Sequence, residues 1–147
     1  MAVDLADAAL KMVFGPSYYI RQQKPFVISD ISEPEPDIAV IKGDIRDFTD
    51  AHPTEAELIV DVADSSLRYD RAIKGSLYAK AGIAEYWIVN LVDQQLEVYS
   101  EPGPDVDADY GFSYRLSNIF KSGQQVTPMC ASQNSVANSV PVADILP

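Results

Sequence analysis

The sequence predicts an α/β fold in which helices flank a mixed β-sheet. Residues 58–63 form a nearly continuous apolar run, which is typical of a strand buried on both faces of a sheet. Apolar residues at helical spacing follow over residues 67–81 and end at a glycine, and residues 85–90 form a second apolar run. Strand, helix and strand in this order indicate a βαβ-like unit. Residues 95–99 then predict an antiparallel partner, so the sheet should be mixed.

Shorter elements precede and follow this unit. Apolar residues at helical spacing predict a helix over residues 4–13, which ends at a Gly-Pro pair. Residues 18–21 and 26–28 indicate two short strands that could form a hairpin. Residues 37–41 predict a strand that begins directly after a proline, where the missing N–H removes no ladder bond. One more strand is expected near residues 110–116.

The composition is typical of one soluble globular domain, to which we assign residues 1–147. A chain of 147 residues can bury one ordinary core but is short for two. Hydrophobic residues make up 47% and charged residues 22%, which is the balance of a folded chain. Cys130 is the only cysteine, which excludes an internal disulfide and fits a reducing compartment. There is no apolar run of about 18 residues and no signal-peptide pattern, so we expect a cytoplasmic protein without a membrane partner.

The formal net charge of −11 bears on the partner. It argues against a broad basic surface of the kind that holds nucleic acid by releasing counterions. The charge does not exclude a nuclease, because carboxylates gathered around a divalent cation add negative charge that the ion neutralises.

Two aspartates are candidate site residues. Asp61 lies inside the apolar run 58–63, where an ionised carboxylate is costly unless a metal, a cation or hydrogen-bond donors compensate it. A structural salt bridge, or a strand-end position near solvent, would explain Asp61 as well. Asp37 opens another strand directly after a loop and can point into a cleft at the sheet edge, although a turn or capping role is the simpler interpretation.

Lys74 is the candidate cation. It borders the predicted core stripe of the helix, about 60° from Leu77 and about 100° from Ile73 at about 3.6 residues per turn. Ala81 completes that stripe. Besides a functional role at the edge of the core, the side chain can extend to solvent or pair with Asp70 four residues earlier.

Three segments in the same order resemble the successive motifs of the Uma-two family of endonucleases, within the PD-(D/E)XK nuclease superfamily. They are PEPDIAVIKG, AELIVDVADSSLRYDRAIK and LYAKAGIAEYWIVNL. The resemblance covers residues 18–99 and is specific through the joint order and spacing, since each motif alone would be weak. It implies a restriction-endonuclease-like fold, with a metal site at one edge of a central mixed sheet.

The resemblance carries over residue by residue. Pro36 and Asp37 match the PD of the superfamily pattern, and Asp61 matches the second acidic position, where the family usually has the longer Glu. The superfamily's lysine usually lies two residues further on, at what is Ala63 here. In the family a lysine from the following helix replaces it, and Lys74 matches that position. Two further residues match recurrent family positions without an assigned role: Asp70 and Tyr78.

The implied function is metal-dependent hydrolysis of phosphodiester bonds in DNA. Asp37 and Asp61 would hold Mg²⁺ or Mn²⁺, the ions that hard oxygen ligands favour, and Lys74 would orient the attacking water and offset developing charge. The resemblance also suggests a homodimer. Two alternatives stay open: a catalytically inactive dimeric binding module, which the net charge supports, and a hydrolase of small phosphate esters, which needs no extended basic surface.

One departure from the family affects the expected activity. The family usually has a preceding segment with a further helix and an acidic residue near the metal. Only Asp4 and Asp7 precede the first strands here, and neither lies in a recognisable copy of that segment. We therefore expect an N-terminally shortened family domain with weak or absent nuclease activity, because the metal would have fewer protein ligands.

Overall fold

The fold is built on a six-stranded sheet whose strands follow one another in chain order. The computed structural model describes residues 2–14, 18–23, 35–43, 55–129 and 139–147. The strands are β1 (Tyr18–Gln22), β2 (Ile38–Lys42), β3 (Leu58–Ala63), β4 (Glu85–Asn90), β5 (Gln95–Pro104) and β6 (Phe112–Lys121). Only β3 and β4 pair in parallel, and the other neighbours pair antiparallel. This mixed sheet confirms the predicted fold class.

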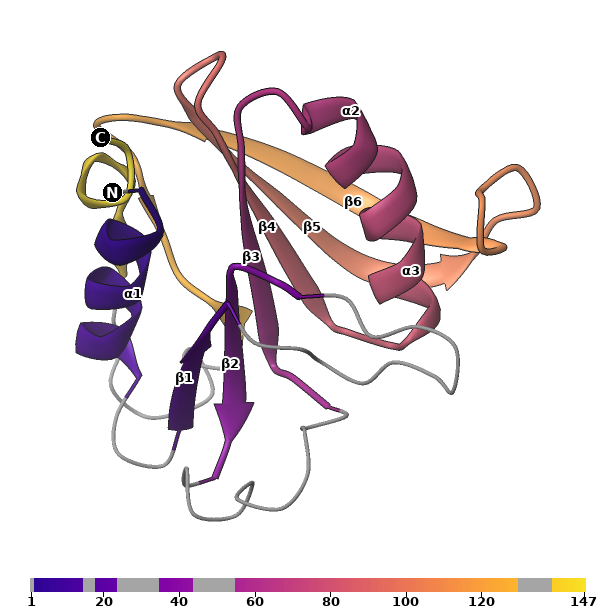
Figure 1. The fold of residues 1–147 in the computed structure, drawn as a ribbon, viewed down its shortest axis with the longest axis horizontal. Coiled ribbons are helices and arrows are strands. Elements are labelled where there is room, and N and C mark those ends of the chain that lie inside the picture. Colours follow the sequence, from indigo (N-terminus) through magenta and orange to yellow (C-terminus); the bar gives the residue numbers. More distant parts are fainter. Residues whose placement is uncertain (1, 15–17, 24–34, 44–54, 130–138) are drawn as a thin grey trace.

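Helices cover both faces of the sheet. One face carries α1 (Ala2–Val13) together with the C-terminal segment, whose elements are β7 (Gln125–Val126), β8 (Val140–Pro141) and the short helix η3 (Val142–Asp144). The other face carries a continuous helical run that links β3 to β4. Its parts are α2 (Leu67–Tyr69), the π-helical turn η2 (Asp70–Lys74) and α3 (Gly75–Lys80). In Figure 1 this run crosses the strands on the side away from α1.

The two faces bury separate apolar clusters. The cluster under α1 is the larger and includes Trp87 and Leu58. The cluster under the α2–α3 run is smaller and includes Ile59, Tyr78 and Tyr86. Successive strand residues point to opposite faces, so both faces of β3 are buried, as its apolar run predicts. The same alternation turns Asp61, two residues after Ile59, toward the smaller cluster.

Most predicted elements are confirmed, but β5 and β6 extend well beyond their predicted ends at residues 99 and 116, to Pro104 and Lys121. The βαβ unit has the parallel pairing of β3 and β4, and β5 is the antiparallel partner of β4. In the described residues β1 pairs with β2. The strand predicted at residues 26–28 lies outside those ranges. No helix of the described residues is long and apolar enough to cross a membrane.

The predicted core stripe of the second helix is wrong. Leu77 is buried, but Ile73 is half-buried and Ala81 is exposed. The prediction assumed a regular α-helix, whereas η2 contains a five-residue π-helical turn. A π-turn holds more residues than an α-turn, so it shifts the register of everything that follows it. The face directed at the sheet therefore differs from the one that regular spacing predicts.

Candidate functional site

Asp37 and Asp61 lie side by side where β2 begins beside β3. Ile38 pairs with Val60 across the two antiparallel strands, so the next step outward brings Asp37 opposite Asp61. Each carboxylate accepts a hydrogen bond from the backbone of the neighbouring strand segment. The Asp37 N–H donates to Asp61 Oδ1 at 3.1 Å, and the Val62 N–H donates to Asp37 Oδ2 at 2.7 Å. Adjacent strands thus fix both carboxylates next to each other where β2 begins.

Asp61 is almost completely buried, with 1% of its surface exposed. Its Oδ2 accepts a hydrogen bond from the Tyr86 hydroxyl at 2.8 Å and lies 3.5 Å from the Lys74 ammonium. Burial raises the pKa of Asp61, although Lys74 and the donated hydrogen bonds oppose that rise. Two hydrogen-bond donors, the Asp37 N–H and the Tyr86 hydroxyl, and one cation, Lys74, therefore compensate the buried negative charge of Asp61.

Lys74 points into the same cluster. Its Nζ lies 3.5 Å from Asp61 Oδ2 and 3.6 Å from Asp70 Oδ1, and the side chain is 25% exposed. Burial alone would lower the pKa of Lys74, but the carboxylates of Asp61, Asp70 and Asp37 outweigh it and raise the pKa. The ammonium is thus held in its charged form between acidic partners rather than extended into solvent.

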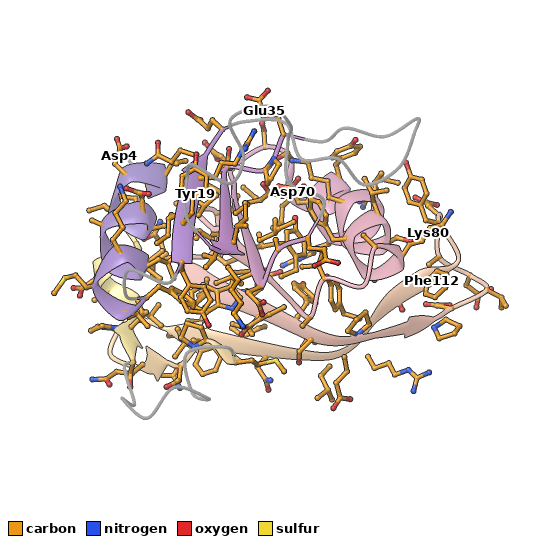
Figure 2. The ribbon with its side chains drawn as sticks, turned by 90° about the horizontal axis from the view of Figure 1, so that it is seen from below. Asp4, Tyr19, Glu35, Asp70, Lys80 and Phe112 are labelled. Carbon is orange, nitrogen blue, oxygen red and sulfur yellow. The ribbon has the colours of Figure 1, made fainter. Side chains whose placement is uncertain are left out.

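Asp70, the suggested ion-pair partner of Lys74, and Tyr78, which had no suggested role, lie near the same carboxylates. Asp70 is 2% exposed, and its Oδ2 accepts a hydrogen bond from the Ser66 hydroxyl at 3.1 Å. Its Oδ1 and the Tyr78 hydroxyl are buried without a hydrogen-bond partner among the described residues. Burial raises the pKa of Tyr78, and the nearby Asp61 and Asp70 raise it further. Figure 2 shows Asp70 inside the molecule, while Lys80 reaches the surface.

A second polar cluster anchors the helical run to the sheet, and sequence reasoning missed it. Glu97 on β5 is 2% exposed and accepts hydrogen bonds from Arg71 Nε at 2.8 Å and from the Tyr99 hydroxyl at 2.6 Å. Arg71 Nη2 donates to its second oxygen, so the pair is bidentate. Asn90 and Gln95 donate to that oxygen too. The available signal was a glutamate between two apolar strand residues, Leu96 and Val98.

The charges around Lys74 do not balance. Three carboxylates, those of Asp37, Asp61 and Asp70, interact with one ammonium. When all are ionised, the cluster carries two uncompensated negative charges (−3 + 1). Among the described residues no group of three or more His, Cys, Asp or Glu side chains is arranged to hold a metal ion. The cluster can therefore supply few protein ligands at once.

The mixed sheet with helices on both faces defines a protein of the α/β class, and it brings the acidic cluster and its lysine together. The model of the Uma2 family, described as "Putative restriction endonuclease", matches residues 2–137. The chain belongs to this family. No protein with a curated description matches it.

A solved structure supports the fold. The structure of this chain is similar to the crystal structure described as a putative nuclease belonging to DUF820 from Anabaena variabilis, with a TM-score of 0.67 and 14% sequence identity. The match covers 98% of this chain and 77% of that one. At this identity the likeness shows a shared fold, and with the family match it confirms the predicted nuclease-like architecture.

Proposed function

We propose that the chain is a metal-dependent endonuclease that hydrolyses phosphodiester bonds in DNA. Family membership and the nuclease-like fold support the reaction class. The observation that carries the proposal is the convergence of Asp37, Asp61 and Lys74 on one cluster at the start of β2. We assign these three residues to catalysis, and the two aspartates to metal binding.

The residues present fit Mg²⁺ or Mn²⁺. Both ions prefer hard oxygen ligands, and Mg²⁺ commonly binds through one or two carboxylates while keeping several waters. The carboxylates of Asp37 and Asp61 match that requirement, and a bound cation would offset the negative charge of the cluster. When bound, such an ion would polarise a phosphate oxygen and lower the pKa of a water.

The protein groups supply orientation. The backbone N–H groups of Asp37 and Val62 and the Tyr86 hydroxyl hold the two carboxylates in place. Lys74 supplies a positive charge beside Asp61, where it can donate to the attacking water and stabilise the charge that develops on phosphate oxygens.

The net charge of −11 favours a second candidate substrate, a small phosphate ester. Such a substrate needs no extended basic surface, whereas a DNA duplex gains affinity from one. We also propose a homodimer, which would let two sites address two strands. A cytoplasmic location fits a chain with the single cysteine Cys130.

The test is a cleavage assay on supercoiled plasmid with Mg²⁺, Mn²⁺ or EDTA, run beside hydrolysis of bis(p-nitrophenyl) phosphate. Lys74→Ala should lower the rate at least about 100-fold. Lys80→Ala is the matched control, because Lys80 lies on the same helical run and is exposed. Cleavage that persists in EDTA or in Lys74→Ala would contradict the proposal, and activity on the small ester alone would select the second candidate.

Metal binding is measured separately, by titration calorimetry with Mn²⁺ on the wild type and on Asp61→Asn. This readout does not require activity. Binding without cleavage would show a metal site without nuclease activity, whereas no binding at millimolar Mn²⁺ would favour the inactive binding module.

A further inference from the structure

A pocket separate from the acidic cluster lies between the helical run and the β5–β6 hairpin. Its volume is about 260 Å³. The helical run contributes Ala72, Gly75 and Ser76, and the sheet contributes aromatic rings. None of the proposed catalytic residues lines it. The pocket is therefore a distinct concave feature on the same face of the sheet.

Its floor is a triangle of tyrosine rings from three neighbouring strands, Tyr86 on β4, Tyr99 on β5 and Tyr114 on β6. Their ring centroids lie 6.2 to 6.4 Å apart. Every hydroxyl is already used inside the protein: Tyr86 donates to Asp61, Tyr99 to Glu97 and Tyr114 to the Ile83 carbonyl. Tyr86 is fully buried, whereas Tyr99 and Tyr114 are half-buried. The floor thus offers aromatic surface rather than free hydroxyl donors.

The hairpin that forms the rim is fixed in place. The Ser76 hydroxyl donates to the Phe112 carbonyl at 2.6 Å and accepts from the Tyr110 N–H at 2.9 Å. Within the hairpin the Asp105 N–H donates to the Gly111 carbonyl at 2.9 Å. These bonds tie the turn to α3, so the pocket is preformed.

The rim is acidic. Asp105 is used structurally, since its two oxygens accept from the Asp107 N–H at 3.0 Å and the Ser113 hydroxyl at 2.9 Å. Asp107 and Asp109 are exposed, and no ion pair to either occurs within residues 55–129 or the other described ranges. The positive charge in the lining, Arg71, is matched by its bidentate pair with Glu97. The carboxylates of Asp105, Asp107 and Asp109 therefore make the electrostatic potential at the pocket entrance negative.

We propose that this pocket binds an organic ammonium ion with an apolar body. The ammonium would lie near the rim carboxylates and over the half-buried tyrosine rings, which attract cations through their π-systems. The apolar body would cover the floor, whose hydroxyls are occupied. A phosphate or carboxylate ligand would meet three negative charges at the entrance. The ligand is either a free small amine or the side chain of a lysine in another protein, and the inference does not depend on nuclease activity.

The test is a titration followed by ¹H–¹⁵N correlation spectra with three probes of one shape: benzylammonium, benzyl alcohol and benzoate. Benzylammonium should shift the amide signals of Asp107, Ala108 and Tyr110 with the lowest dissociation constant. Benzyl alcohol should bind at least about threefold more weakly, as loss of a cation–π contact implies. Benzoate binding as tightly as benzylammonium, or shifts confined to residues outside the pocket, would overturn the proposal.

Variants separate charge from shape. Asp107→Asn with Asp109→Asn should weaken benzylammonium binding roughly tenfold, about threefold for each charge at this range in water, and leave benzyl alcohol unchanged. Asp4→Asn with Glu35→Gln removes the same charge from exposed residues outside the lining and is the control. Equal weakening by both pairs would refute a local site.

A plug and a peptide complete the design. Ala72 is exposed, so Ala72→Phe should fold normally and block binding of both benzylammonium and benzyl alcohol. A capped Gly-Lys-Gly peptide, titrated beside butylammonium, distinguishes the two sources. Tighter binding of either supports the proposal and identifies the source, whereas no shift from either probe or from benzylammonium overturns it.

Discussion

Glu97 should make the folded state lose stability as the pH falls below 4.5. Burial alone would raise the pKa of its carboxyl, but the Arg71 guanidinium and the hydrogen bonds from Tyr99, Asn90 and Gln95 lower the pKa to about 2 from an ordinary 4.5. Between these values the unfolded chain binds a proton that the folded chain does not. The stabilisation is therefore fully present above pH 4.5 and is lost as the pH falls toward 2.

The size of the effect follows from the same two values. One pKa unit corresponds to about 1.36 kcal/mol, so the interval from 4.5 to about 2 sets an upper limit of about 3.4 kcal/mol. The Arg71 side chain is 42% exposed, so solvent screens the pair. We therefore expect a contribution of about 1–3 kcal/mol to the free energy of unfolding at neutral pH.

The assay is urea unfolding of the wild type and of Glu97→Gln at about pH 5.5 and about pH 2.5. The variant should be less stable by about 1–3 kcal/mol at the higher pH, and the difference should shrink at the lower one. Glu101→Gln, an exposed position on the same strand, is the control and should change little at either pH. A difference between wild type and Glu97→Gln that stays constant with pH would refute the reasoning.

Three other side chains give predictions about the pH dependence of stability, stability at neutral pH and metal affinity. Glu85 is 2% exposed and burial raises its pKa above 4.5, so its contribution is full below pH 4.5 and declines as the pH rises; the stability difference between wild type and Glu85→Gln should change with pH in the opposite sense to that of Glu97. Tyr78→Phe removes a buried hydroxyl without a partner in the described residues, so unfolding at neutral pH should show no loss, or a gain of up to about 1 kcal/mol; a loss beyond about 1 kcal/mol would reveal a partner. Asp61→Asn should weaken Mn²⁺ binding at least about tenfold in calorimetry and shift the free energy of unfolding by less than about 2 kcal/mol, because it removes a penalised buried charge together with an acceptor; unchanged affinity would exclude Asp61 as a ligand.

The fold was largely predictable because its strongest signals are apolar runs. The runs that form β3 and β4 are buried on both faces, which left little freedom in assigning them. Turn residues then fixed the antiparallel partner of β4. The family motifs added the nuclease-like architecture, which periodicity alone could not name.

The helical run was predicted less well, for a physical reason. Apolar spacing identifies a helix, but a π-turn leaves no such pattern, since it is stabilised by contacts with distant residues. Arg71 reaches Glu97, which lies 26 positions away in the sequence. The half-buried position of Ile73, which lies inside this turn, follows from the local change of register, whereas Ala81 is exposed at the C-cap of α3.

The acidic cluster was anticipated in part. Asp61 could be singled out because a carboxylate in an apolar strand needs compensation, and the motif supplied Asp37 and Lys74. The backbone donors at Asp37 and Val62 and the Tyr86 hydroxyl could not be found from sequence, because they depend on the register of β2, β3 and β4. The assignment of Asp37, Asp61 and Lys74 to catalysis stays a prediction.

One short segment, the π-turn η2, borders both the proposed metal site and the sheet anchor. Asp70 and Lys74, at its two ends, both face the buried carboxylates, while Arg71 next to Asp70 points to Glu97 and borders the tyrosine pocket. The bidentate pair holds η2 against β5, and that constraint limits where Lys74 can lie relative to Asp61. Changes at Glu97 should therefore affect the acidic cluster indirectly, because Arg71, which Glu97 holds, lies in the same turn as Lys74.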